Sequence, residues 1–261
     1  MATAVHSKSA KAYYDHYRVS PWASATGVTF GADAVEYTPL ENDYKLFIQG
    51  KASANGSTIN GFMDIADDGF DEVEFADIND GKHYILRAPQ GTSSGSVAYE
   101  TVEASTGVSR AMDIANVAML NWSGQPTEEF YRGFVISAGE QAVTATGELT
   151  GVNVGASTVT VQRCEVVIRV VSVSGSGSVG FQIQESQNDG SPDAYADITM
   201  SAESPTQGLV TFGTNTATFT GVGTIKLYTT AATEAWKRVQ VSAFSGFTSV
   251  SVIVTCGNAD N

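Results

Sequence analysis

The segment Arg163–Val173 constrains the fold more than any other part of the chain, because its side chains alternate in character with a period of two. One face carries only apolar side chains, namely Cys164, Val166, Ile168 and Val170. The opposite face mixes valines with charges, namely Arg163, Glu165, Val167, Arg169 and Val171. A period of two is that of a β-strand. We therefore expect a central strand that is buried on one face and partly covered on the other.

Composition extends this expectation to the whole chain. Of the 261 residues 42% are apolar, which is enough for a packed core. Thr, Val, Ser and Gly are abundant and helix-forming residues are scarce, as is typical of short strands joined by turns. Further strands are expected at Val28–Tyr37, Tyr44–Ile48, Ser57–Met63, His83–Arg87, Val97–Val102, Val117–Trp122, Phe181–Glu185, Tyr195–Thr199, Ala217–Thr220, Thr224–Thr229, Lys237–Ala243 and Thr248–Cys256. The chain is predicted to be all-β, built as a sandwich or jelly roll.

Two local patterns refine the strand assignment. The alternation that begins at Val28 changes phase at Asp33–Val35, which predicts a β-bulge. The glycine-rich run Ser174–Ser178 lies between two predicted strands and contains no lysine. It predicts a hairpin turn and not a phosphate-binding loop.

The two halves of the chain differ in composition, which predicts two domains. Charged residues become sparser after residue 135, where Gly, Ser, Thr and Val dominate. The segment Ser137–Ser157 is small, polar and rich in glycine, and it has no strong period, as is typical of a linker. We expect a first domain at 1–135, a linker at 136–157 and a C-terminal β-sandwich at 158–261, of jelly-roll or immunoglobulin-like type.

The charge of the chain limits its partners. The formal net charge is −14, from 28 acidic and 14 basic residues, and no cluster of Lys and Arg is present. Tight binding to DNA and docking on an anionic membrane are therefore not expected. The first residues contain no apolar signal-peptide core, and no apolar run is long enough to span a bilayer. The product is expected to be cytoplasmic when synthesised.

No residue pattern predicts a catalytic, cofactor or metal site. The acidic run Asp64–Glu72 would need a bidentate glutamate where Phe75 stands to form a calcium-binding loop, so capping of a turn explains it better. The three histidines lack the paired spacing of a zinc site. Cys164 and Cys256 lie on the apolar faces of their strands. They are either two buried thiols or strand neighbours that pair when oxidised.

The N-terminal part of the chain resembles the start of the major tail tube proteins of long-tailed bacteriophages. The matching pieces are Lys8–Asp15, the strand Val28–Tyr37, the loop Glu41–Lys45, Ile48–Lys51, the strand Ser57–Asp64 and an acidic segment from Asp67. The resemblance implies a β-sandwich or barrel with one short helix, over Asp67–Asp80. The pieces Gln182–Ser186, Asn188–Gly190, Tyr195–Asp197 and Trp236–Val241 also resemble the C-terminal extension of this family.

This resemblance implies a structural virion protein and not an enzyme. In that family six copies close a ring, rings stack into a tube, and DNA passes through the tube without specific binding. Closing the ring would satisfy exposed strand edges. The acidity of the chain would suit such a lumen, although it is also explained by solubility alone. The expected partners are other copies of the chain and other phage tail proteins, in a virion tail assembled in the host cytoplasm.

The resemblance also implies a contact loop at Thr38–Gly56. Its apolar residues Tyr44, Leu46, Phe47 and Ile48 are the predicted contacts with the next ring, and the alternative is a hairpin that packs into the core. The C-terminal sandwich would decorate the tube and could contact host surface glycans. Two other functions stay open: a carbohydrate-binding or adhesin module, and a glycan hydrolase.

Overall fold

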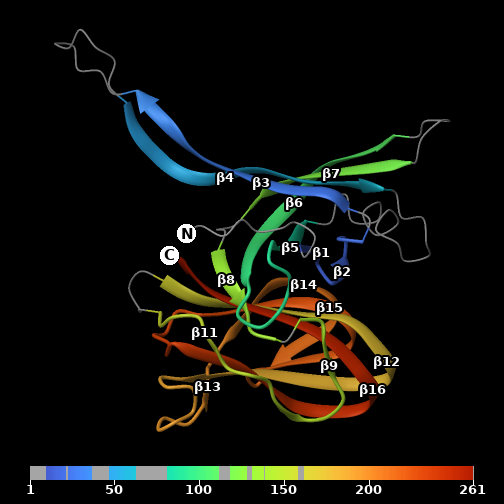
Figure 1. Ribbon diagram of the computed structural model, residues 1–261, viewed down its shortest axis with the longest axis vertical. Coiled ribbons are helices and arrows are strands. Elements are labelled where there is room, and N and C mark those ends of the chain that lie inside the picture. Colours follow the sequence, from blue (N-terminus) through green and yellow to red (C-terminus); the bar gives the residue numbers. More distant parts are fainter. Residues whose placement is uncertain are drawn as a thin grey trace. The chain divides into compact units, whose positions relative to one another are not determined.

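The computed structural model describes residues 10–21, 23–36, 47–62, 81–111, 118–127, 131–137, 139–157 and 162–260. Every regular element within these ranges is a β-strand, which confirms the all-β prediction (Figure 1). The predicted helix at Asp67–Asp80 lies outside the described residues. The chain forms two compact units, each built from separate stretches. Unit 1 comprises Met1–Pro21, Lys82–Val102 and Phe130–Asn261, and unit 2 comprises Trp22–Gly81 and Glu103–Glu129.

Four long strands form the larger part of unit 1, in the spatial order β14-β15-β12-β16. Their bounds are Gln162–Ser186 for β12, Ser201–Gly213 for β14, Thr216–Thr229 for β15 and Trp236–Asp260 for β16. Strands β12 and β16 pair antiparallel along almost their whole length. Several of the predicted short strands are therefore parts of longer ones. The predicted strands Lys237–Ala243 and Thr248–Cys256, for example, both belong to β16.

The prediction of a hairpin turn at Ser174–Ser178 is wrong, since these residues lie in the middle of β12. The pairing with β16 changes register there, at Gly175. Gly175 has a φ of +90°, and a Cβ on Gly177 would lie only 1.9 Å from the carbonyl oxygen of Ser245. Glycine in a strand permits a bulge and a close backbone approach. This run therefore bends a continuous strand and does not reverse the chain.

The bent strands enclose one hydrophobic core. The apolar face predicted for Arg163–Val173 contributes Cys164, Val166, Ile168 and Val170, all fully buried. Beyond the bend the same face of β12 adds Val179, Phe181 and Ile183. The rings of Phe181 and Phe219 pack edge to face, with their centroids 5.8 Å apart.

The segment predicted to be a linker lies along this core. It carries three short strands, β9 at Gln141–Val143, β10 at Gly147–Glu148 and β11 at Val152–Asn153, each paired with β16. Its apolar residues Val143, Leu149, Val152 and Val154 belong to the core cluster. A further short strand, β13 at Ala196–Asp197, pairs with β12.

A second group of strands in unit 1 continues the sheet beyond β16, in the order β8-β6-β5-β1-β2. Their bounds are Lys11–Tyr14 for β1, Tyr17–Arg18 for β2, Lys82–Ala88 for β5, Val97–Ala111 for β6 and Tyr131–Val135 for β8. A smaller core joins Tyr13, Leu86, Ala88, Ala98, Val135 and Ile253, and Val171 of β12 packs against it. The charged face of β12 is therefore covered, as its valines indicated.

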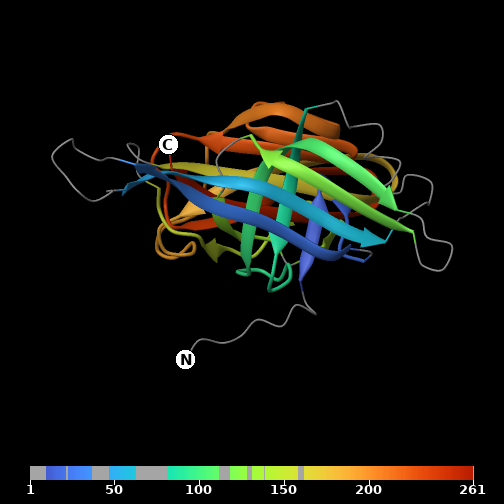
Figure 2. The same ribbon diagram turned by 90° about the horizontal axis from the view of Figure 1, so that it is seen from above.

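Unit 2 is an antiparallel sheet in the order β3-β4-β7-β6. It consists of β3 at Ala23–Glu36, β4 at Phe47–Phe62, β7 at Met119–Pro126 and the Glu103–Ala111 part of β6. Figure 2 shows β3 and β4 side by side as a long pair. The register between them shifts between Ala32 and Ala34, which confirms the predicted bulge at Asp33–Val35.

Candidate functional site: an open strand edge and buried polar clusters

The four residues predicted to contact the next ring are only partly covered by the structure. Tyr44 and Leu46 lie outside the described residues. The backbones of Phe47 and Ile48 begin β4 and are paired with Glu36 and Val35 of β3. The inter-ring contact of these residues therefore stays a prediction.

Strand β3 forms an edge of the unit 2 sheet. It is 14 residues long and pairs with β4 on one side, and no second partner strand occurs within the described ranges. The strand contains no proline, lysine or arginine. An edge strand of this length presents a row of backbone donors and acceptors to which another strand can pair. Such an edge is a candidate assembly site.

Strand β14, at an edge of unit 1, has a different character. Its pairing with β15 changes register between Glu203 and Gln207, and again between Gly208 and Val210. Pro205 lies within the first irregularity. A proline and bulges are typical of edges that are protected against pairing with another chain. Strand β3 also pairs with register shifts and carries Asp33 and Glu36, so the difference between the two edges is the proline of β14.

A buried ion pair links β12 to β6 on the covered face of β12. The Arg169 guanidinium donates to both carboxylate oxygens of Glu100, at 2.6 and 2.7 Å, and both side chains are almost fully buried. Arg169 also donates to the backbone oxygens of Asp15 and Tyr84, at 2.8 and 3.2 Å. The Thr255 hydroxyl donates to Glu100 at 2.6 Å. Bidentate geometry and these additional bonds offset the desolvation of the two charges.

A second buried pair connects β5 to the turn between β1 and β2. His83 Nδ1 lies 3.0 Å from Asp15 Oδ2, and Asp15 Oδ1 accepts a bond of 2.7 Å from the Tyr84 backbone N–H. The His83 ring stacks on Tyr14 with a centroid separation of 4.6 Å. Asp15 has a φ of +50°, a conformation that Asp adopts more readily than most residues. These contacts assign His83 a role in positioning the N-terminal strands.

Glu165 is the centre of a third charged cluster on the same face of β12. It is fully buried and pairs with Arg163 and with Lys226, whose Nζ lies 3.2 Å away. Glu203 binds the same two cations at 3.0 and 3.3 Å. Burial raises the pKa of Glu165, because desolvation outweighs the attraction of the two cations.

An exposed polar cluster surrounds Tyr195. The Arg238 guanidinium lies 4.0 Å from the centre of its ring, and the Tyr195 hydroxyl donates to Asp189 at 2.7 Å. Arg238 in turn donates to both carboxylate oxygens of Glu148, at 2.7 and 2.8 Å. An aromatic ring among planar polar groups is chemically suited to a sugar, but here these groups bind one another. Contact with glycans therefore stays a prediction.

One motif was missed in the sequence. Gly91–Gly95 matches the Gly-x-Ser-x-Gly spacing of a nucleophile elbow. That elbow requires a turn from a strand into a helix, whereas these residues connect β5 to β6. The structural context therefore does not match the motif.

The structure adds two findings on metals and membranes. Over the described ranges, no group of three or more His, Cys, Asp or Glu side chains is arranged to hold a metal ion. The acidic run Asp64–Glu72 lies outside those ranges. The described part of the chain contains no helix long and apolar enough to cross a membrane.

Comparisons with known proteins give the following similarities. No protein-family model and no curated protein matches the sequence. A chain in the virion of a native gene transfer agent particle is similar at 18% identity with a TM-score of 0.41, over 49% of this chain and 98% of that chain. The Dit protein of phage SPP1, described as a hub adsorption apparatus of phages that infect Gram-positive bacteria, is similar at 10% identity. Its TM-score is 0.35, over 96% of this chain and 99% of that chain.

Proposed function

We propose that this chain is a structural subunit of a phage-type tail tube, in which six copies close a ring and rings stack into a tube that conducts DNA. The open edge of β3 is the observation that carries the proposal. The resemblance of the N-terminal residues to tail tube proteins supports the same role. The net charge of −14 suits a lumen that must not retain DNA.

The strand order of the unit 2 sheet supports such a ring. Among the described residues, β3 stands at one end of this order and the Glu103–Ala111 part of β6 at the other. If β3 of one copy pairs with β6 of the next, the contact is head-to-tail and closes by rotation. Four strands per copy in six copies give a closed barrel of about 24 strands, with a backbone diameter of about 48 Å at a tilt of about 40°. Inward side chains narrow this by about 10 Å, and the remaining bore admits a DNA duplex.

Electron microscopy of the purified chain tests this proposal. The wild-type protein is expected to form rings or tubes, and Thr26→Lys is expected to stay monomeric. Thr26 is an exposed residue of β3, and lysine on an edge strand opposes pairing with another strand. The matched control is Thr211→Lys, at an exposed position of β14, which is expected to assemble like the wild type.

Two results would contradict the proposal. The first is assembly of Thr26→Lys at the wild-type concentration, because it would exclude the β3 edge as the contact. The second is a wild-type protein that stays monomeric at high concentration. A monomer that binds sugars would favour the adhesin alternative, and release of sugar from cell walls would favour the hydrolase alternative.

A further inference from the structure

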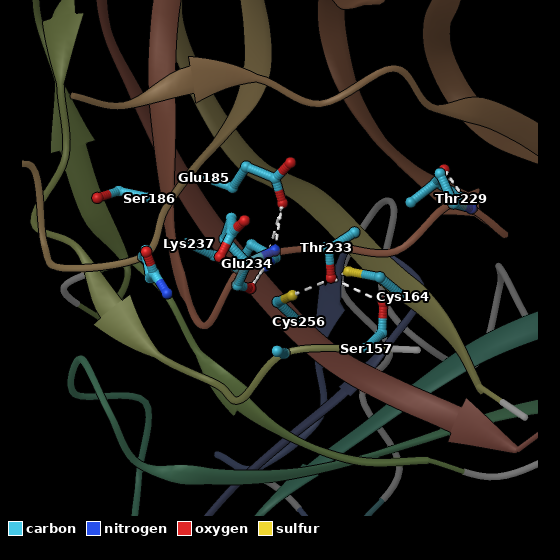
Figure 3. Close-up of polar contacts among 12 residues, drawn as sticks. Ser157, Cys164, Glu185, Ser186, Thr229, Thr233, Glu234, Lys237 and Cys256 are labelled. Atoms are coloured by element: carbon cyan, nitrogen blue, oxygen red, sulfur yellow. Dashed lines mark hydrogen bonds and ion pairs between the residues drawn. The ribbon is translucent and has the colours of Figure 1, made fainter. Parts of the chain in front are cut away.

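Cys164 and Cys256 lie side by side in the main core of unit 1. Their sulfur atoms are 3.7 Å apart, and both residues are fully buried (Figure 3). Cys256 of β16 is paired with Val166 of β12, so the two cysteines are diagonal neighbours on adjacent strands. Diagonal neighbours lie about 7–8 Å apart, slightly beyond the usual Cα separation of a disulfide, so closing the bond also requires a small shift of the two strands. The sulfur atoms need to approach by only about 1.7 Å to reach bonding distance.

A buried cation lies near the two thiols. Lys237 is fully buried, donates to the backbone oxygen of Glu234, and has its ammonium 3.5 Å from a carboxylate oxygen of Glu185 (Figure 3). The hydrogen bond with Cys256 lowers the pKa of the Cys164 thiol, and the positive charge of Lys237 acts in the same direction. The same thiol–thiol contact raises the pKa of Cys256. The contact between the thiols thus favours one thiolate over two, and we take Cys164, which also has a hydrogen bond with Thr233, as the thiol that attacks first.

The cover over this site is thin. Thr233 has a hydrogen bond with Cys164, and its hydroxyl contacts the Ser157 hydroxyl at 2.8 Å (Figure 3). These two residues form an isolated β-bridge outside the named strands. The neighbours Ala231, Ala232 and Glu234 are exposed. Opening of this bridge would admit a small reagent without breaking the pairing of β12 with β16.

We propose that Cys164 and Cys256 form a dithiol modification site, which small disulfide-class oxidants convert into a cross-link between β12 and β16. In the first step the Cys164 thiolate attacks an external disulfide, forms a mixed disulfide and releases one thiolate. In the second step Cys256 loses its proton and attacks the Cys164 sulfur, which releases the second thiolate. The protein thus loses two electrons and two protons, and the external disulfide is reduced to two thiols.

The cross-link would tie β16 to β12. It would join residues that are 92 positions apart, so it would restrict the unfolded chain strongly. For a chain of this size the expected rise in Tm is on the order of 10 °C. The inference rests on the geometry of unit 1 and is independent of the proposed tail role.

The test is oxidation of the full chain with oxidised glutathione, followed by intact mass, thiol titration and thermal unfolding. The wild type is expected to lose both thiols without retaining glutathione, and to gain Tm in a way that dithiothreitol reverses. Cys164→Ala and Cys256→Ala are each expected to show no rise in Tm on oxidation. Lys237→Met keeps both cysteines but removes the nearby positive charge, so it is expected to slow their oxidation several-fold at neutral pH.

A second probe keeps the proposal testable if a variant does not fold. Phenylarsine oxide bridges two thiols that lie close together, so the wild-type protein is expected to bind one equivalent. Ser157→Ala is expected to accelerate this binding because it weakens the cover. Retention of both thiols under oxidant and arsenical would overturn the proposal. So would cross-links between chains only, or a fall in Tm on oxidation.

Discussion

The Arg169–Glu100 pair allows a sharp test of how unit 1 is stabilised. Replacing Arg169 with methionine keeps most of the volume of the side chain but removes the charge and its donors. Glu100 would keep the Thr255 hydroxyl as its partner at 2.6 Å, and the backbone oxygens of Asp15 and Tyr84 would each lose a bond to Arg169. Breaking a buried pair on one side costs about 3–5 kcal/mol. We expect Arg169→Met to lower the free energy of unfolding by about 4 kcal/mol.

The same pair also predicts a result for the double variant. In Arg169→Met with Glu100→Leu no unpaired charge is left in the core, so the loss is expected to be smaller than the sum of the two single losses. A coupling free energy of about 2–3 kcal/mol is expected from a double-mutant cycle. The measurement is unfolding in urea, followed by tryptophan fluorescence and circular dichroism.

The matched control is Arg238→Met. Arg238 also binds a glutamate through two bonds, but its partner Glu148 is 51% exposed. The exposed pair contributes less than about 1 kcal/mol, and the contacts of Arg238 with Tyr195 and Gln184 add to it, so Arg238→Met is expected to cost about 2 kcal/mol. The reasoning is refuted if Arg169→Met lowers the free energy of unfolding no more than Arg238→Met does. It is also refuted if the losses in Arg169→Met and Glu100→Leu simply add, because burial of the pair would then not explain its contribution to stability.

Two further predictions concern the bend of the long strands and the N-terminal turn. Gly177→Ala is expected to destabilise the protein by about 1–3 kcal/mol, because the new Cβ would collide with the Ser245 carbonyl oxygen. Gly213→Ala is its control in thermal unfolding, since a Cβ there meets nothing within 4 Å, and equal losses would exclude a steric cause at the bend. Burial lowers the pKa of His16 below its value in the unfolded chain. On acidification the unfolded chain therefore binds a proton before the folded chain does, and the stability of the fold is lost as pH falls through the folded pKa of His16. His16→Gln is therefore expected to lose less stability than the wild type between pH 7.5 and 5.0 in urea unfolding, and an identical loss would refute this reasoning.

The sequence allowed the faces of the central strand to be predicted, but not its length. Alternation in Arg163–Val173 correctly assigned Cys164 and Ile168 to the core and Val171 to a covered face. The run Ser174–Ser178 was misread because glycine serves both in turns and in strand bulges. What distinguishes the two is the backbone of Ser245 on the facing strand, which comes from a distant part of the chain.

The partners of the buried charges could not be predicted for the same reason. Arg169 is separated by 69 positions from Glu100, and no local pattern relates the two. The cysteines are a partial exception, since both lie on apolar strand faces and their proximity was one of two alternatives. Their separation of 3.7 Å decides that these strands are neighbours.

The bend in the long strands has a mechanical consequence. Strands β12 and β16 each run through the bend without a break. The parts of the main core before and after the bend are therefore joined by covalent backbone as well as by side chains. A force that drives one half past the other must stretch the chain or break the β12–β16 hydrogen bonds on both sides of the bend at once. Two separate sheets can slide past each other along their apolar interface, but the continuous strands prevent this movement here. Under a pulling load this unit should yield in one abrupt step.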